Sequence, residues 1–484
     1  MTEIAGLPFW EVRYDADGNP DPVEETALIN AVSNGAITDL VIFAHGWNNN
    51  PNVAFRLYQG FFGVLAEQFR NTPFIPPPGS AVDATATLSA KIGFAGVLWP
   101  SQRWSDEPIP DFEAPVRSAG GGAASIGGPP SGERVALSPE IDPETLSGLR
   151  EVFPAAVAQL DRMAELLTGP ASDAAQTEFY NQLKQFAALV GTDDDDGEDD
   201  RPRTGLAPGE PAMLLDGPRE LFGRYADALR QTGADLAQPA ADDAGRNDAG
   251  LGAAGIGDML GKALHGAKEA LRQATYWQMK NRAGTVGREG LGRMLGRLHA
   301  RAPQLRVHLI GHSFGARLVS YALAGLPAGL DPSPIKSVTL LEGAFSQWVF
   351  APKLPSDPSR SGALAGMLVR IDGPLIAVHS RHDGAVGTFY PLASMAARDD
   401  SAGIGDANSR WGGIGANGAQ GAHARPDGIR PAGPGNRYPF VRQQILNVDA
   451  SDVVRAGGPP SGAHSDIVHP ELTWIVLTAG RIVP

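Results

Sequence analysis

The stretch "RVHLIGHSFGARLVSYALAG", from Arg306 to Gly325, decides the fold. Val307, Leu309 and Ile310 make a short apolar run with β-branched members, which predicts a buried strand. After Ser313 the apolar residues recur at helical spacing until Gly325, which offers a stop. The stretch therefore predicts a strand, a sharp turn and a helix, with Ser313 on the turn.

Glycines stand two residues before and two residues after Ser313. Among 484 residues with 60 glycines, the pattern Gly-x-Ser-x-Gly arises by chance roughly 0.4 times, so its context has to carry the interpretation. A strand-to-helix turn needs backbone angles that most residues resist, and small neighbours let the helix pass close to the strand. Such a turn exposes the hydroxyl near the helix N-terminus and directs the Phe314 amide at a developing oxyanion. We interpret Ser313 as a nucleophile, and the alternative is a serine that only caps the helix.

Length and composition narrow the class of protein. The chain has 484 residues, of which 42 % are hydrophobic, enough for a large core, and no apolar run approaches the roughly 18 residues of a membrane span. The formal net charge of −14, without a basic block containing aromatic residues, disfavours nucleic acid as a partner. The absence of cysteine removes disulfides, thiolate metal sites and cysteine nucleophiles. The N-terminus shows no basic region followed by an apolar one, so we expect a cytoplasmic protein.

Apolar strand patterns alternate with helical patterns along most of the chain. This alternation predicts an α/β fold whose mostly parallel, doubly wound sheet is covered by helices on both faces. We expect residues 1–104 to form the first part of this core and residues 265–484 the second part. Residues 105–264 are expected to form a helical insertion with flexible Gly/Pro/Ala-rich and acidic segments, whose helices dock on the core and partly cover Ser313.

The reactive groups of such a sheet gather on the loops at the carboxyl ends of its strands. A serine needs a base within hydrogen-bond reach and a carboxylate that orients the base. Asp383 lies just after the apolar strand "LIAVHS", and His464 lies between the last strand and the final helix. Glu342, after the preceding strand, is the alternative acid, and His469 is the alternative base.

Taken together, these motifs resemble the α/β-hydrolase superfamily. The resemblance rests on strand-"GHSFG"-helix, an upstream strand ending in "HGW", and the order nucleophile, acid, histidine. It covers roughly residues 8–104 and 265–484. It implies a catalytic triad of Ser313, Asp383 and His464, and an oxyanion hole formed by the amides of Trp47 and Phe314.

The hypothesis from the sequence is an esterase- or lipase-like serine hydrolase that cleaves carboxylic esters through an acyl-enzyme. It requires no metal and no organic cofactor. Aromatic residues near the expected site favour a small-molecule ester with an apolar acyl or alcohol group. Thioesterase, acyltransferase or peptidase activity would use the same triad. A non-catalytic binding or scaffold protein built on a hydrolase core is the alternative from another class.

Overall fold

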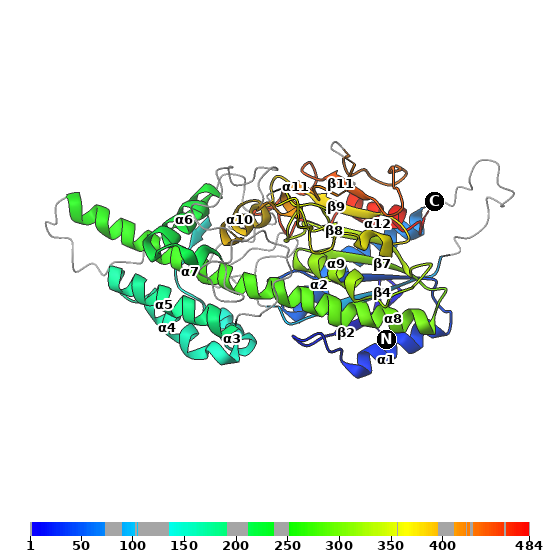
Figure 1. Cartoon of the computed structure of the whole chain (residues 1–484), viewed down its shortest axis with the longest axis horizontal. Helices are drawn as coiled ribbons and strands as arrows, with labels where there is room; N and C mark the ends of the chain where they lie inside the picture. Colours follow the sequence, from blue (N-terminus) through cyan, green and yellow to red (C-terminus); the bar gives the residue numbers. More distant parts are fainter. Residues whose placement is uncertain are drawn as a thin grey trace, which may run out of the picture.

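A single mixed sheet forms the centre of the molecule (Figure 1). The computed structural model describes residues 2–72, 90–101, 104, 135–190, 212–236, 251–355, 357–394, 411–422, 424–425, 429–458 and 461–483. Within these residues nine strands pair in the order β1-β2-β4-β3-β7-β8-β9-β11-β10. The strands are β1 Thr2–Ile4, β2 Leu7–Arg13, β3 Asp39–Ala44, β4 Ile92–Leu98, β7 Arg306–His312, β8 Ile335–Leu341, β9 Leu375–His379, β10 Ala424–Arg425 and β11 Ile445–Asp449. All neighbours are parallel except β1 and β2. The predicted α/β class with a mostly parallel sheet is confirmed.

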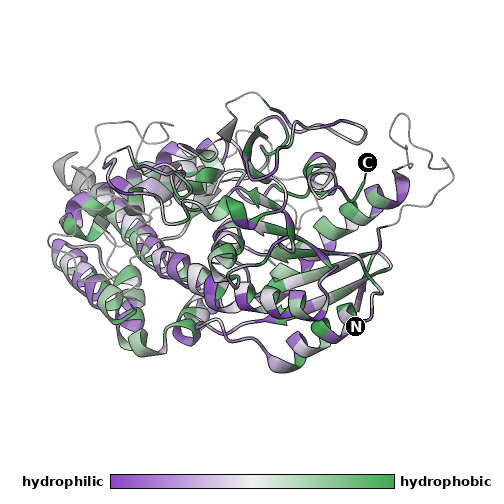
Figure 2. Ribbon diagram, turned by 45° about the vertical axis from the view of Figure 1, so that its right-hand side comes forward, coloured by the Kyte–Doolittle hydropathy of each residue, from purple (hydrophilic) through white to green (hydrophobic). Residues whose placement is uncertain are grey.

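Helices cover both faces of the sheet because side chains alternate along each strand. In β3, Leu40 and Ile42 belong to the hydrophobic cluster on one face, and Val41 and Phe43 to the cluster on the other. The first face packs against α1 (Pro22–Ser33), α8 (Gly292–Arg301) and α9 (Phe314–Gly325). The second packs against α2 (Pro51–Asn71) and α12 (Pro470–Ala479). Burial on both faces explains why the central strands are mostly apolar, as Figure 2 shows.

One long helix connects the region before the nucleophile strand to the sheet. Helix α7 (Leu251–Thr285) continues through a π-helical turn (Val286–Leu291) directly into α8, and together they run along much of the molecule (Figure 1). The expected end of the insertion at residue 264 falls inside α7. The insertion and the second part of the core therefore share a helix.

The insertion contributes a second group of helices. They are α3 Pro143–Val152, α4 Val157–Thr168, α5 Asp173–Val190 and α6 Pro218–Gln231, accompanied by the parallel pair β5 Val135–Leu137 and β6 Ala234–Leu236. Leu160, Phe186 and Phe222 belong to the same hydrophobic cluster as the α9 face of the sheet, so the insertion is packed onto the core. The Gly/Pro/Ala-rich stretch 117–133 and the acidic run 193–200, both expected to be flexible, lie outside the described residues.

Short elements complete the second part of the core, namely a π-helical turn at Ala385–Phe389, α10 Tyr390–Ser394 and α11 Ile414–Asn417. None of the helices in the described ranges combines the length and the apolar character that crossing a membrane requires.

Glycines allow the α7–α8 helix to lie directly on α9. A Cβ added at Gly287 would lie 2.2 Å from the carbonyl oxygen of Leu318, and one at Gly292 would lie 2.5 Å from that of Ala322. These distances are far below a van der Waals contact, so the two backbones approach as closely as glycine permits. This packing fixes α9, and with it the turn at Ser313.

We predict that Gly287→Ala lowers the free energy of unfolding by about 1–3 kcal/mol, because the added methyl group forces the two helices apart. Gly63→Ala in α2 is the matched control, since nothing lies within 4 Å of the position of its added Cβ. That helix-interior change should stabilise the chain by about 0.5–1 kcal/mol. Urea unfolding of both variants measures the difference, and equal effects would show that the close helix contact does not exist.

Candidate active site

Ser313 lies on a strained turn between β7 and α9. Its backbone angles are φ 56° and ψ −120°, which a residue with a Cβ rarely adopts. An added Cβ at Gly311 would lie 2.3 Å from the carbonyl oxygen of Gly315, and one at Gly315 would lie 1.9 Å from that of Ala44. Both flanking glycines are therefore required by the close passage of the helix. The Ser313 side chain makes no capping hydrogen bond to α9, which argues against the capping alternative.

The structure brings the three residues of the expected triad together from the loops after β7, β9 and β11. The Ser313 Oγ and the His464 Nε2 are 2.8 Å apart, and the His464 Nδ1 lies 2.8 Å from the Asp383 Oδ2. Because a carboxylate only accepts, Nδ1 carries the proton, and Nε2 is free to accept from the serine hydroxyl. Asp383 is held in turn by the Val386 amide, which donates to its Oδ1 over 2.9 Å.

This array lies below the protein surface. Ser313, His464 and Asp383 have 3 %, 7 % and 2 % of their surface exposed. Low water access strengthens the electrostatic contacts among the three side chains. It also means that a substrate reaches Ser313 through a narrow opening or after a local movement.

The alternative base and the alternative acid have other positions. His469 Nε2 lies 2.8 Å from Asp466 Oδ1, at the start of α12. Glu342 directly follows β8 and is a fully buried residue with φ 48°. Gly415 touches both acids, since its added Cβ would lie 2.9 Å from the Asp383 Oδ2 and 2.6 Å from the Glu342 carbonyl carbon. The acid that contacts the His464 ring is Asp383.

Glu342 and Asp383 form a buried pair of neighbouring carboxyl groups. Burial, reinforced by the negative charge of Asp383, raises the pKa of Glu342 well above its ordinary value. Ionisation of two neighbouring carboxyl groups away from water is unfavourable in free energy, because the two negative charges repel each other. Glu342 therefore favours its neutral form, and Asp383 is the acid whose side chain faces the histidine.

The loop after β3 lies directly on the nucleophile. An added Cβ at Gly46 would lie 2.6 Å from the Cβ of Ser313. The amides of Trp47 and Phe314 donate to no acceptor among the described residues, so both remain available as the expected oxyanion donors. His45 supports this loop, because its Nδ1 donates to the Gly46 carbonyl over 2.8 Å. Burial lowers the pKa of His45 to about 4, so its ring is neutral.

A second neutral histidine supports the base. The His312 Nε2 donates to the backbone carbonyl of His464 over 2.8 Å. Burial, and then the electrostatic effect of the neighbouring His464 ring, lowers the pKa of His312 to about 3. His312 therefore fixes the His464 loop by a hydrogen bond and does not compete for the proton of Ser313.

Aromatic rings form one wall beside the turn. Tyr276 of α7 packs between two of them, with ring centres 5.2 Å from Trp47 and 4.4 Å from Phe314. Its hydroxyl lies 3.4 Å from the Ala344 carbonyl oxygen. Helix α7, which begins in the expected insertion, thus contributes a side chain to the surroundings of Ser313.

A second Ser-His-Asp array lies at the opposite ends of the strands, and sequence reasoning missed it. The Ser337 Oγ is 3.0 Å from the His308 Nδ1, and the His308 Nε2 is 2.9 Å from the Asp39 Oδ1. All three side chains are buried. Ser337 lies within β8 and does not precede a helix. The only signal in the sequence is that polar residues interrupt apolar strands. Polar side chains in such strands are buried and therefore need hydrogen-bond partners inside the protein. We interpret this array as structural.

The described residues contain no cluster of three or more His, Asp or Glu side chains suited to hold a metal ion. No family model, curated protein or solved structure matches the chain. The chemistry of the site is therefore interpreted from its own geometry.

The pairing of Glu342 with Asp383 makes stability depend on pH. Since the folded chain holds the Glu342 proton more tightly than the unfolded chain does, the free energy of unfolding falls as pH rises above 4.5, the ordinary pKa of the group. Glu342→Gln removes this linkage. The stability of the variant relative to the wild type should rise with pH by up to about 1.4 kcal/mol per pH unit.

Urea unfolding between about pH 5 and pH 8 measures this difference. Glu67→Gln, on the exposed side of α2, controls for the loss of one carboxyl group. A Glu342→Gln difference that stays constant over this range would contradict the neutral state of Glu342.

Proposed function

We propose that this chain is a serine hydrolase that cleaves carboxylic esters through an acyl-enzyme. The observation that carries the proposal is the hydrogen-bonded series Ser313, His464 and Asp383 with its serine on a strained strand-to-helix turn. A serine hydroxyl is a weak nucleophile until a base removes its proton. A neutral Nε2 at 2.8 Å is positioned to do so.

The reaction proceeds in two halves. In the first, Ser313 Oγ attacks the ester carbonyl carbon while its proton passes to His464, and Asp383 stabilises the imidazolium. The oxyanion of the tetrahedral intermediate accepts hydrogen bonds from the Trp47 and Phe314 amides. The intermediate collapses as His464 returns the proton to the leaving alcohol. In the second half, a water molecule gives a proton to His464 and attacks the acyl carbon. The second tetrahedral intermediate collapses as His464 returns that proton to the Ser313 Oγ, which releases the carboxylic acid and restores the free serine and the neutral histidine.

We further propose that the fold is of the α/β-hydrolase type. The chain order serine, aspartate, histidine supports this, because it is the order of that superfamily. The strand order β1-β2-β4-β3-β7-β8-β9-β11 also resembles that of the superfamily, with the nucleophile strand β7 near the middle of the sheet. The helical insertion before β7 is an addition that this resemblance does not cover.

The preferred substrate is an ester with an apolar acyl or alcohol group. The packed rings of Trp47, Tyr276 and Phe314 beside Ser313 support this choice, because aromatic rings favour contact with apolar groups. A binding protein that retains an unused hydrolase core would have no need to keep the serine in a strained conformation, which costs about 1–3 kcal/mol.

We predict that Ser313→Ala lowers kcat/KM for a panel of activated esters of graded chain length by a factor on the order of a thousand or more, because the attacking atom is gone. Ser337→Ala is the matched control, since it removes the serine of the second array and should leave turnover within a few-fold of wild type. Loss of turnover in Ser337→Ala alone, or a fully active Ser313→Ala, would overturn the assignment.

A further inference from the structure

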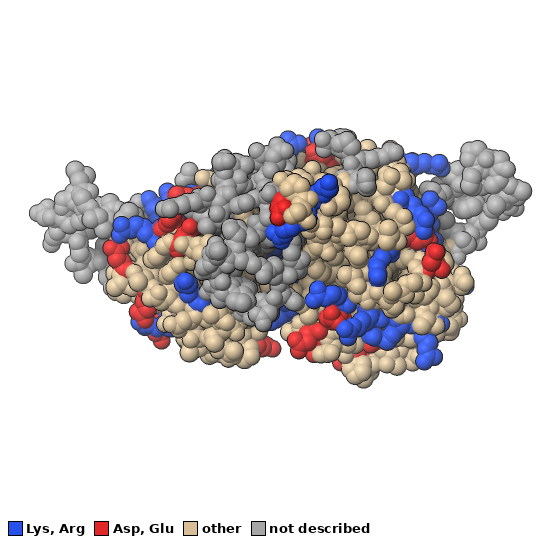
Figure 3. Space-filling model, in the orientation of Figure 1, with Lys and Arg blue, Asp and Glu red and all other residues tan. Residues whose placement is uncertain are grey.

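A pocket of about 470 Å³ lies at the edge of the sheet opposite to Ser313. The loops that lead into β7, β8, β9 and β11 form its walls, together with the end of α12. This is the end of the molecule that carries the C-terminus (Figure 1), and Figure 3 shows several groups of Lys and Arg there. Its size falls within the range of small-molecule sites, which is roughly 300–1,000 Å³.

The lining of this pocket is basic, although the whole chain has a formal net charge of −14. Its charged members are Arg306, Lys336, Arg442 and Arg481 against Asp372 alone. A cluster of cations within an acidic protein creates a local positive potential, which the dry walls of a pocket concentrate.

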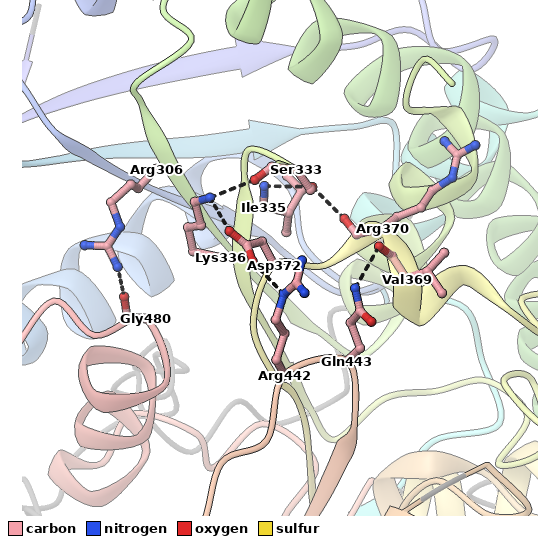
Figure 4. Close-up of polar contacts among 10 residues, drawn as sticks. All are labelled: Arg306, Ser333, Ile335, Lys336, Val369, Arg370, Asp372, Arg442, Gln443 and Gly480. Carbon is pink, nitrogen blue, oxygen red and sulfur yellow. Dashed lines mark hydrogen bonds and ion pairs between the residues drawn. The ribbon is translucent and has the colours of Figure 1, made fainter. Parts of the chain in front are cut away.

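Two of the four cations share one carboxylate. The Lys336 Nζ lies 2.6 Å from the Asp372 Oδ2, and the Arg442 Nε lies 2.7 Å from the Asp372 Oδ1. Figure 4 shows both side chains directed at this single acid. Despite partial burial, Lys336 and then Arg442 lower the pKa of Asp372, so it carries one negative charge. One positive charge of this group stays uncompensated.

The remaining two cations add to this excess. Arg306 pairs with Asp39 over 3.0 Å and donates to the carbonyl of Gly480 at the end of α12 (Figure 4). The Arg481 side chain is exposed and forms no ion pair with any described residue. The pocket thus holds four cations but only two neighbouring carboxylates. Ion pairs that anchor the strand ends explain Arg306 and one of the two cations beside Asp372. They do not explain the second cation beside Asp372, or Arg481.

We propose that this pocket binds a compact organic dianion, of the phosphate monoester or dicarboxylate class, at the side chains of Lys336, Arg442 and Arg481. Two uncompensated positive charges match a dianion better than a monocarboxylate. Arginine forms paired, charge-assisted hydrogen bonds with phosphate and carboxylate oxygens. Phe440 and four prolines in the walls supply a rigid apolar surface for the organic part. This site is independent of the proposed hydrolase activity.

Calorimetric titration of the full chain tests the proposal with phenyl phosphate and with succinate, using acetate at the same ionic strength as the monoanion control. We expect one saturable site for at least one of the two dianions and none for acetate. Arg442→Ala and Arg481→Ala should each weaken binding about tenfold or more, which corresponds to about 1.4 kcal/mol. Both side chains are exposed, so the fold should tolerate these changes.

Two further variants separate specific binding from a general charge effect. Asp372→Asn should tighten binding, because it removes the carboxylate that competes with the ligand for Lys336 and Arg442. Lys353→Ala removes an exposed cation outside the pocket and should change nothing. The proposal is overturned if neither dianion saturates the chain below about 10 mM, or if Lys353→Ala weakens binding as much as Arg442→Ala does.

Discussion

The close passage of α9 over the carboxyl ends of β3 and β7 is the constraint on which the rest of the structure depends. At Gly315 the helix backbone lies so near the Ala44 carbonyl that no side chain fits, and at Gly46 the opposite loop touches Ser313 itself. This crowding holds the serine at a positive φ and aims its hydroxyl at His464. The α7–α8 helix maintains the crowding from outside, because its glycines let it press on α9.

The described part of the sheet carries two Ser-His-Asp arrays that share one hydrogen-bond pattern, and we interpret one as reactive and the other as structural. Their serine-histidine distances are similar, 2.8 Å at Ser313 and 3.0 Å at Ser337. Ser337 lies within strand β8 inside the core, next to a register shift in the β7–β8 pairing, and there the array compensates buried polar groups. Ser313 stands at a helix N-terminus, beside the amides of Trp47 and Phe314, which donate to no acceptor within the described part of the chain. A helix N-terminus stabilises negative charge. The backbone around the serine is what favours a reactive role at one end and a structural role at the other.

Much of this arrangement could be predicted from local sequence patterns. Strand and helix periodicity around Ser313 predicted the turn. The resemblance to the α/β-hydrolase superfamily, through the chain order of Asp383 and His464, predicted which loops meet this turn. The joining of α7 to α8 could not be predicted, because the glycines at 284–292 suggest a break in an isolated chain, whereas packing on α9 keeps the helix intact. The neutral state of Glu342 and the shared carboxylate Asp372 depend on contacts between residues that are distant in the sequence, so no local pattern contains them.

The reactivity of Ser313 is tested most directly by mapping the covalent adduct of a fluorophosphonate on the wild-type chain by peptide mass spectrometry. A serine that a neighbouring imidazole activates attacks the phosphorus atom, displaces fluoride and stays covalently bonded to the phosphorus, whereas an ordinary buried serine does not react. The structure predicts a single stoichiometric adduct on the peptide that contains Ser313. An adduct on Ser337 or on another residue, or no adduct at all, would contradict the nucleophile assignment and the hydrolase function with it.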